Sequence, residues 1–299
     1  MPQTAGRHRV EVTSSLDGSR QPAYLILPPG YDPAGPARPL VVSLHTWSFD
    51  LEQRNEDLEQ LVAEAGWLYL FPNFRGRNDH PEACASPLAR QDVIDALDWV
   101  LAHFAADPGR VYLTGISGGG YMTLAMVTSF PERWRAASAW VPLADLRAWY
   151  DFHALDEYGE MTQACIGGDP FEQRDLLAEL ARRSPLHEMA RARDVALDIA
   201  AGCDDGHLGE PIPVWHSLAA FNALAVAVDA PPISDSEIAQ LSRHEPRLEH
   251  PLPSDELFDE EFGRQILLRR HAGHARVSIF AGAHEGIAGG AMGWFQAHP

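Results

Sequence analysis

The feature that most constrains this fold is an alternation of short apolar runs with amphipathic helical patterns. Apolar runs typical of buried strands occur at 40–45, 67–71, 111–114, 136–141, 195–201 and 277–281. Helical patterns separate them, at 51–65, 91–105, 121–129 and 214–228, and a short helix is expected at 286–296. Strands that alternate with helices favour a mostly parallel sheet with helices on both faces. We therefore expect an α/β fold that forms a single domain over residues 1–299.

Other segments depart from this alternation. Runs at 8–13 and 23–27, joined across the turn residues Asp17 and Gly18, predict an antiparallel start to the sheet. Residues 143–193, after the sixth strand, predict a helical insertion or lid. Residues 231–263 are acidic and rich in proline, so we expect a surface excursion there rather than a strand.

The charge balance excludes some classes of partner. Acidic residues outnumber basic ones 42 to 23, which gives a formal net charge of −19. Nucleic acids and anionic membrane surfaces attract proteins through a positive patch, so we expect neither as a partner. The three cysteines cannot all pair, although a bridge between Cys84 and Cys165 stays open. No CxxC or HExxH spacing occurs, so we expect no metal and no cofactor.

The start of the chain carries no apolar segment of the kind that directs secretion. Residues 1–10 lack an apolar run, and no run in the chain reaches membrane-spanning length. We therefore expect a cytoplasmic protein, while a secreted chain from which a signal has been trimmed would look the same.

The stretch GISGG at 115–119 is the main indication of chemistry. It directly follows the strand at 111–114 and directly precedes a helix. A strand-to-helix turn this tight forces the central residue, Ser117, into strained φ/ψ, and the flanking glycines remove side chains that would collide. The helix dipole and the Gly118 N–H can then stabilise an oxyanion beside the serine. The loop lacks the GK[ST] ending of a phosphate-binding loop, so it indicates a nucleophilic serine.

A serine nucleophile needs a histidine base held by a carboxylate, and after such a turn the chain order is Ser, then Asp or Glu, then His. His284 follows the last strand, whereas His271 precedes it at the other edge of the sheet. We therefore assign the base to His284. Asp204 and Asp205 both follow the strand at 195–201. We favour Asp205 as the acid and keep Asp204 in reserve.

A second oxyanion donor should come from the loop after the strand at 40–45. The backbone N–H of Thr46 or of Trp47 could donate there, beside that of Gly118. The loop departs from the HGG form that leaves its backbone most free, so the choice between the two stays open.

Some large side chains near the strand ends are candidates for substrate binding. Trp140, Trp149 and Tyr150 could wall a pocket, although core packing explains them equally well. Arg75 could bind a substrate carboxylate, although a structural salt bridge is an equally good explanation.

These motifs together resemble the catalytic domain of the prolyl oligopeptidase family of α/β-hydrolases. The stretch GISGGGYM at 115–122 is close to that family's GxSxGGYM motif. Supporting matches are NFRG at 73–76, SAWVP at 138–142 followed by Asp145 and Leu146, and Asp205 ahead of IP at 212–213. The resemblance implies the α/β-hydrolase fold, a triad of Ser117, Asp205 and His284, and hydrolysis through an acyl-enzyme.

Two departures from the family shape the functional expectation. Peptidases of the family usually carry a large N-terminal propeller that gates peptide access, whereas here residues 1–39 precede the third strand. The family's tyrosine that completes the oxyanion hole has no clear match after His45. Stand-alone relatives are often carboxylesterases, including some that act on acetyl or feruloyl esters of carbohydrates.

We therefore expect a serine carboxylesterase that acts on a small-molecule ester. A prolyl-oligopeptidase-like serine peptidase or aminopeptidase is the alternative, and a non-catalytic binding protein is a third hypothesis. An intact set of Ser117, Asp205 and His284 in the expected order counts against the third. The oligomeric state is not encoded in any pattern that we recognise.

Overall fold

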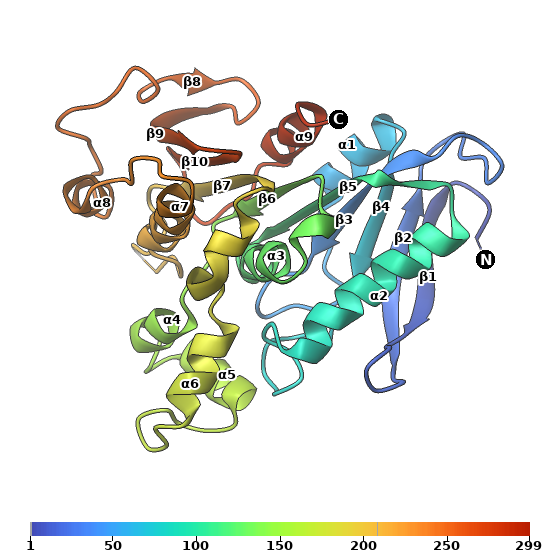
Figure 1. The fold of residues 1–299 in the computed structure, drawn as a ribbon, viewed down its shortest axis with the longest axis horizontal. Coiled ribbons are helices and arrows are strands. Elements are labelled where there is room, and N and C mark those ends of the chain that lie inside the picture. Colours follow the sequence, from blue (N-terminus) through green and yellow to red (C-terminus); the bar gives the residue numbers. More distant parts are fainter. Residues whose placement is uncertain (1, 208) are drawn as a thin grey trace.

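A ten-stranded sheet runs through the computed structural model, which describes residues 2–207 and 209–299 (Figure 1). The strand order is β1-β2-β4-β3-β5-β6-β7-β10-β9-β8. The strands are β1 (Gly6–Thr13), β2 (Arg20–Leu27), β3 (Arg38–Leu44), β4 (Leu68–Pro72), β5 (Ala106–Ile116), β6 (Ala136–Trp140), β7 (Ala196–Gly202), β8 (Phe258–Asp259), β9 (Arg264–Ala272) and β10 (Ala275–Phe280).

The pairing directions divide this sheet into a parallel middle and antiparallel edges. From β4 through β3, β5, β6 and β7 to β10, every neighbouring pair is parallel. The pairs β1–β2, β2–β4, β10–β9 and β9–β8 are antiparallel. The mostly parallel α/β sheet and its antiparallel start, both expected from the sequence, are confirmed.

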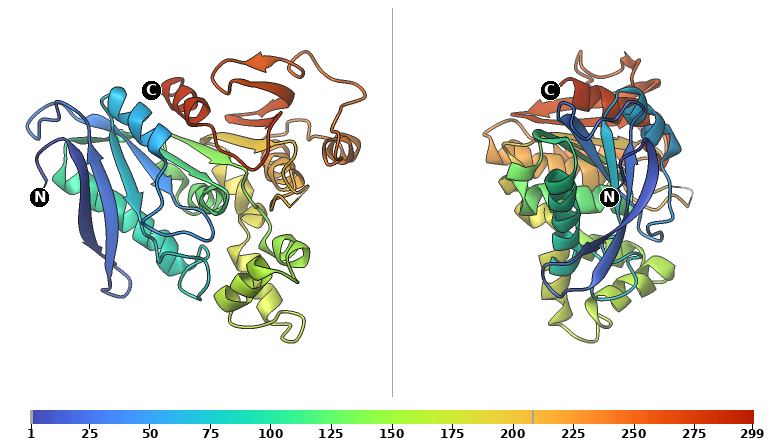
Figure 2. Two further views of the ribbon diagram at one scale, coloured as in Figure 1. Left: turned by 180° about the vertical axis from the view of Figure 1, so that it is seen from behind. Right: turned by 90° about the vertical axis from the view of Figure 1, so that its right-hand side faces the viewer.

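Helices cover both faces of the sheet (Figures 1 and 2). On one face, α1 (Glu56–Glu64) and α9 (Ala288–Gln296) contact each other. The other face is covered by α2 (Pro87–His103), α3 (Gly118–Ser129) and α7 (Trp215–Ala227). Because helices lie on both sides, the middle strands β6, β7 and β10 are buried along their whole length.

The first helix begins later than the sequence pattern indicates. We expected a helix over 51–65, but α1 starts at Glu56. The side chain of Asn55 accepts a hydrogen bond from the N–H of Leu58 at 3.3 Å and so caps the helix. Leu51 is buried in the preceding turn, which explains why it fits a helical apolar pattern without being helical.

Two strands, β8 and β9, were missed from the sequence. The longer of the two is β9. Its residues alternate between buried and exposed positions, and charged side chains hide the pattern. Arg269 and Arg270 lie in the strand because each finds an acidic partner, Asp259 for the first and Asp255 for the second. The segment 231–263 is also more structured than expected, since it contains α8 (Asp235–Leu241) and β8.

The insertion at 143–193 contains four helices: α4 (Leu146–Phe152), α5 (Glu157–Ile166), α6 (Leu176–Arg183) and the 3₁₀ helix η2 (Pro185–Ala192). Outside the insertion, a shorter 3₁₀ helix, η1 (Pro131–Arg133), precedes β6. Helices α4, α5 and α6 lie together at one end of the molecule, away from both termini (Figure 1). That residues 1–299 form one domain, with this insertion as a lid, stays a prediction.

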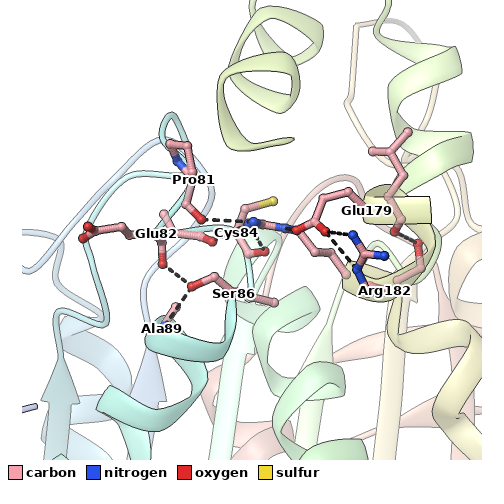
Figure 3. Close-up of polar contacts among 12 residues, drawn as sticks. Pro81, Glu82, Cys84, Ser86, Ala89, Glu179 and Arg182 are labelled. Atoms are coloured by element: carbon pink, nitrogen blue, oxygen red, sulfur yellow. Dashed lines mark hydrogen bonds and ion pairs between the residues drawn. The ribbon is translucent and has the colours of Figure 1, made fainter. Parts of the chain in front are cut away.

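Arg183 fastens this insertion to the loop before α2. Its guanidinium donates to the carbonyls of Pro81, Ala83 and Cys84 at 3.0, 2.9 and 3.3 Å. Figure 3 shows Pro81 and Cys84 of this loop opposite Glu179, whose carboxylate accepts a hydrogen bond from Arg183 at 2.6 Å.

The cysteines form no disulfide. Cys84, Cys165 and Cys203 are all free and buried. The bridge between Cys84 and Cys165 that the sequence left open is therefore not formed, although the two thiols are neighbours at the base of the insertion. Among residues 2–207 and 209–299, no helix is long and apolar enough to cross a membrane.

Candidate active site

Ser117 occupies a strained turn between β5 and α3. Its φ is +59° and its ψ −120°, a backbone conformation that residues other than glycine rarely adopt. The Ser117 N–H donates to the carbonyl of Trp140 at 2.9 Å, which fixes the turn to the neighbouring strand β6. A Cβ on Gly115 would lie 2.3 Å from the carbonyl carbon of Gly119, so this turn requires glycine. The strained serine predicted from GISGG is confirmed.

Asp205 and His284 meet at the carboxyl ends of two adjacent parallel strands. Asp205 follows β7, His284 follows β10, and these strands pair directly. The His284 Nδ1–H donates to Asp205 Oδ2 at 2.8 Å. The other carboxylate oxygen accepts from the N–H of Ile212 at 2.9 Å and of Gly206 at 3.1 Å. Asp205 is buried and Asp204 exposed, which favours Asp205, the acid preferred from the sequence.

The ring nitrogen of His284 that does not face Asp205 is the one suited to act as a base. A carboxylate only accepts hydrogen bonds, so Nδ1 carries the proton and Nε2 carries a lone pair. In the part of the chain that the structure describes, Nε2 has no hydrogen-bond partner, and the His284 side chain is 16% exposed.

The loop that carries His284 lies against the serine turn. A Cβ on Gly286 would come within 2.4 Å of the side chain of Ile116, the residue just before Ser117. Within residues 2–207 and 209–299, no hydrogen bond joins the Ser117 hydroxyl to His284. Such bonds often form only when substrate binds.

The backbone of the loop after β3 lies against Gly118, as expected for an oxyanion hole. A Cβ on Gly118 would be 2.3 Å from the Trp47 nitrogen and 2.9 Å from the Thr46 carbonyl carbon. The Thr46 N–H already donates to Gln53 Oε1 at 2.8 Å. Trp47 is therefore the better donor of the two alternatives that the sequence left open.

His45 and Gln53 support this loop and were not singled out from the sequence. The ring of His45 lies within hydrogen-bond distance of the Thr46 and Asn73 carbonyls, at 3.0 and 2.8 Å, and stacks on Phe74. Burial lowers the pKa of His45 below its usual value. In the sequence, only the position of His45 directly after β3 could have indicated that it supports the site.

The expected aromatic pocket wall is not a free surface. Trp140, Trp149 and Tyr150 are each about 1% exposed. Trp149 packs on Trp47 with ring centroids 5.5 Å apart, and the Tyr150 hydroxyl contacts Asp169 at 3.1 Å. Of the two explanations the sequence allowed for these side chains, the structure favours core packing.

Arg75 is likewise engaged within the protein. Its guanidinium bonds the carboxylates of Asp92 at 2.6 Å, Asp17 at 2.8 Å and Glu82 at 3.0 Å. These partners, the Asp17 hydrogen bond first, raise the pKa of Arg75 above its usual value. A guanidinium bound in this way has no free side for a substrate carboxylate, so the structural salt bridge is the better explanation.

An open cavity of about 240 Å³ adjoins the serine turn. Thr46, Gln53, Gly115 and Ile116 line it on the side of the oxyanion loop. The start of α1 closes its far side with Arg54, Asn55, Glu56 and Asp57. Gly115 and Ile116, the two residues before Ser117, are the part of the serine turn that borders this cavity.

Among the described residues, the side chains close enough together to hold a metal include the acid–base pair. Asp205, Glu210 and His284 bring ligand atoms within 4.8 Å of one another. Because Asp205 and His284 are already joined by a hydrogen bond, their closeness is explained without an ion.

A strained serine at a strand end, together with a buried aspartate that orients a histidine, defines a serine hydrolase. The prolyl oligopeptidase family model matches residues 55–244, which include Ser117 and Asp205. This chain belongs to the prolyl oligopeptidase family.

Curated relatives share part of this region. An acylamino-acid-releasing enzyme of Arabidopsis thaliana is 24% identical over 160 residues, which is 47% of this chain and 21% of that protein. The acylamino-acid-releasing enzyme 2 of Oryza sativa subsp. japonica is 28% identical over 140 residues, which is 44% of this chain and 16% of that protein. The matches thus cover about a fifth or less of these relatives' length.

Solved structures show the same fold. An acylaminoacyl peptidase of Pyrococcus horikoshii matches 75% of this chain and 36% of its own, with a TM-score of 0.61 and 19% identity. A puromycin-hydrolyzing peptidase of Mycobacterium tuberculosis matches 75% of this chain and 34% of its own, with a TM-score of 0.59 and 21% identity.

Proposed function

We propose that this chain is a serine peptidase that cleaves the amide bond after an N-acylated amino acid. The observation that carries the proposal is the hydrogen-bonded Asp205–His284 pair beside the Ser117 turn, in a chain whose matched relatives are acylamino-acid-releasing enzymes. The catalytic roles follow from the positions of these side chains at neighbouring strand ends.

In the first half of the reaction, Ser117 Oγ attacks the scissile carbonyl carbon while His284 Nε2 takes the hydroxyl proton. The His284 imidazolium then gives that proton to the leaving amine, and the amine departs from an acyl-enzyme ester. In the second half, water attacks the ester, His284 takes a proton from the water, and Ser117 regains it as the acid leaves. Asp205 keeps the proton of His284 on Nδ1 throughout.

Two backbone N–H groups stabilise the negative oxygen of each tetrahedral intermediate. Gly118 is the first residue of α3, so its N–H lies at the positive end of the helix. Trp47 lies against it, within the close approach that only a glycine at 118 allows. The Trp47 N–H is the group that takes the place of the family's tyrosine hydroxyl.

The sequence led us to expect a carboxylesterase, and the relatives favour the peptidase alternative instead. The site geometry is common to both reactions, since each proceeds through an acyl-enzyme. They differ in the leaving group, because an amine must be protonated before it departs and an alcohol leaves more readily.

The test therefore compares an amide with an unactivated ester of the same acyl part. We would measure kcat/KM for an N-acetylalanyl peptide and for N-acetylalanine methyl ester, with free alanyl peptide as the aminopeptidase substrate. We expect turnover of the acylated peptide and a loss of about 10⁵-fold or more in Ser117→Ala. Turnover of the ester alone, still dependent on Ser117, would show an esterase instead.

A further inference from the structure

A second histidine–aspartate pair lies within the insertion. His153 ends α4, and its Nδ1 lies 2.6 Å from Asp156 Oδ2. Its Nε2 lies 2.9 Å from the carbonyl oxygen of Pro211, in the loop that carries Asp205. His153 is only 5% exposed, so water does not replace these partners. One side chain thus connects the insertion to the loop of the catalytic acid.

Both partners of His153 accept hydrogen bonds and neither can donate one. A carboxylate has no proton to give, and a proline residue contributes only a carbonyl. The Pro211 carbonyl can only accept, so the contact with it is a hydrogen bond that the His153 Nε2–H donates. Asp156 lies on the opposite side of the ring, at Nδ1, and orients it.

The bond to Pro211 reaches Asp205 through one peptide unit. The carbonyl of Pro211 and the N–H of Ile212 belong to the same planar amide. His153 donates to the carbonyl end, and the N–H end donates to Asp205 Oδ1 at 2.9 Å. A donor on the carbonyl polarises the amide and strengthens its N–H as a donor. Asp205 in turn accepts from His284 at 2.8 Å.

We propose that His153 is a positioning residue of the reaction, which holds and polarises the 211–212 peptide so that its N–H fixes Asp205 against His284. This inference rests on the proposed role of Asp205 and His284. Asp156 orients His153, and His153 touches neither substrate nor a reacting atom.

The surroundings of His153 hold it in place. Its ring lies 4.0 Å from that of Trp149 and 5.0 Å from that of Tyr158. A Cβ on Gly159 would lie 2.1 Å from the His153 carbonyl, so α5 can approach only with glycine there. Trp149 also packs on Trp47 of the oxyanion loop, so the insertion contacts both halves of the site.

The other titratable side chains that face His153 do not compete for its protons. His216 faces it and accepts N–H bonds from Ala144 and Asp145 on Nδ1, at 3.2 and 3.4 Å. Burial lowers the pKa of His216 to about 3, so this ring is neutral at pH 7. Burial also raises the pKa of Tyr158, which therefore keeps its proton. Asp156 is the carboxylate that pairs with His153.

The test uses graded variants in the full chain, assayed with the N-acetylalanyl peptide. His153→Phe keeps an aromatic ring and removes both ring nitrogens, and we expect kcat to fall about 10-fold with KM within about 2-fold. His153→Gln can place an amide N–H near the Nε2 position, and we expect it to recover kcat to within about 3-fold of wild type. The acid limb of kcat/KM in His153→Phe should move to higher pH, because a less stabilised Asp205 carboxylate attracts the His284 proton more strongly.

His298→Phe is the matched control, because His298 also packs against a tryptophan four residues earlier, with ring centroids 4.2 Å apart. It should leave kcat and the acid limb unchanged. If His153→Phe does not fold, Asp156→Asn replaces it, since asparagine can still cap α5 while the charge facing His153 is lost. We expect that variant to lose about 3-fold in kcat.

Two results would overturn the inference. One is a folded His153→Phe with wild-type kcat, and the other is an acid limb that moves to lower pH. A wild-type enzyme without Ser117-dependent turnover would instead refute the proposed function. The two failures are therefore distinguishable.

Discussion

Two histidine–aspartate pairs in this protein share their inner contact and differ in their outer one. In each pair, the histidine Nδ1 faces an aspartate Oδ2, at 2.8 Å for His284 and 2.6 Å for His153. In the described part of the chain, the outer nitrogen of His284 has no partner, whereas that of His153 faces the Pro211 carbonyl. A histidine with a free outer nitrogen can accept a proton, and one with both nitrogens engaged can only hold its neighbours.

The two pairs also differ in how the chain brings them together. Asp156 lies three residues after His153, so a single turn forms that pair. Asp205 and His284 are 79 residues apart in sequence and meet because β7 and β10 are parallel neighbours. The long-range pair therefore depends on the whole sheet, and the local pair depends on the insertion alone.

The largest expected effect comes from replacing the long-range aspartate. Asp205→Asn keeps the size of the side chain, but its amide can donate to His284 Nδ1 and so favour the wrong tautomer of the histidine. We therefore expect kcat to fall about 10⁴-fold. The adjacent Asp204 is exposed and unpaired with His284, and Asp204→Asn should stay within about 2-fold of wild type. Steady-state kinetics on the N-acetylalanyl peptide give both numbers. Equal losses in the two variants would show that the acid is wrongly assigned.

An intermediate effect is expected where the oxyanion donors meet. A Cβ in Gly118→Ala would lie 2.3 Å from the Trp47 nitrogen and so displace one N–H. We expect kcat to fall by about 10²–10³-fold. Gly109→Ala is the control, because a Cβ there would meet only the Asp107 side chain at 3.3 Å. If single-turnover acylation in Gly118→Ala matches wild type, these N–H groups do not stabilise the transition state.

The smallest effect concerns His216, a histidine that has no aspartate partner. Burial lowers the pKa of His216 to about 3. Below pH 6.5 the His216 ring is therefore protonated in the unfolded chain but not in the folded chain. This group's contribution to stability is complete above pH 6.5 and is lost as the pH falls toward 3. Between pH 6.5 and 4.5 the free energy of unfolding should fall by about 2 to 3 kcal/mol from this source.

His216→Asn keeps a carbonyl acceptor for the Ala144 N–H and does not titrate, so its stability should depend less on pH. Urea unfolding of both proteins at several pH values measures this difference in slope. Identical slopes would mean that another group causes the acid sensitivity.

The sequence predicted the middle of the fold and identified the residues that the structure brings together in the candidate site. Apolar runs identify β3 to β7 and β10 because these strands are buried on both faces. Ser117 was identifiable because its turn needs glycines at fixed positions, and His284 because it follows the last strand. Each of these patterns lies within a few consecutive residues, so it can be recognised without knowing the fold.

What the sequence could not predict depends on distant partners. Strand β9 was hidden because its arginines are neutralised by Asp259 and Asp255 of the preceding segment. The sequence left two explanations open for Arg75, because its salt-bridge partners Asp17 and Asp92 reach it from other elements. His153 looked like one histidine among fourteen, since only folding brings it to the Pro211 carbonyl.

The contacts of Arg183 with the loop at 81–84 determine which sequence changes the insertion can tolerate. Its three acceptors at 81–84 are backbone carbonyls, which every residue type provides. Substitutions in that loop can therefore accumulate without releasing the insertion, provided that Arg183 itself is kept. The stretch at 167–175 between α5 and α6 carries none of these attachments. A library of sequences grafted there would vary the outer surface of the insertion without moving the site residues at the strand ends.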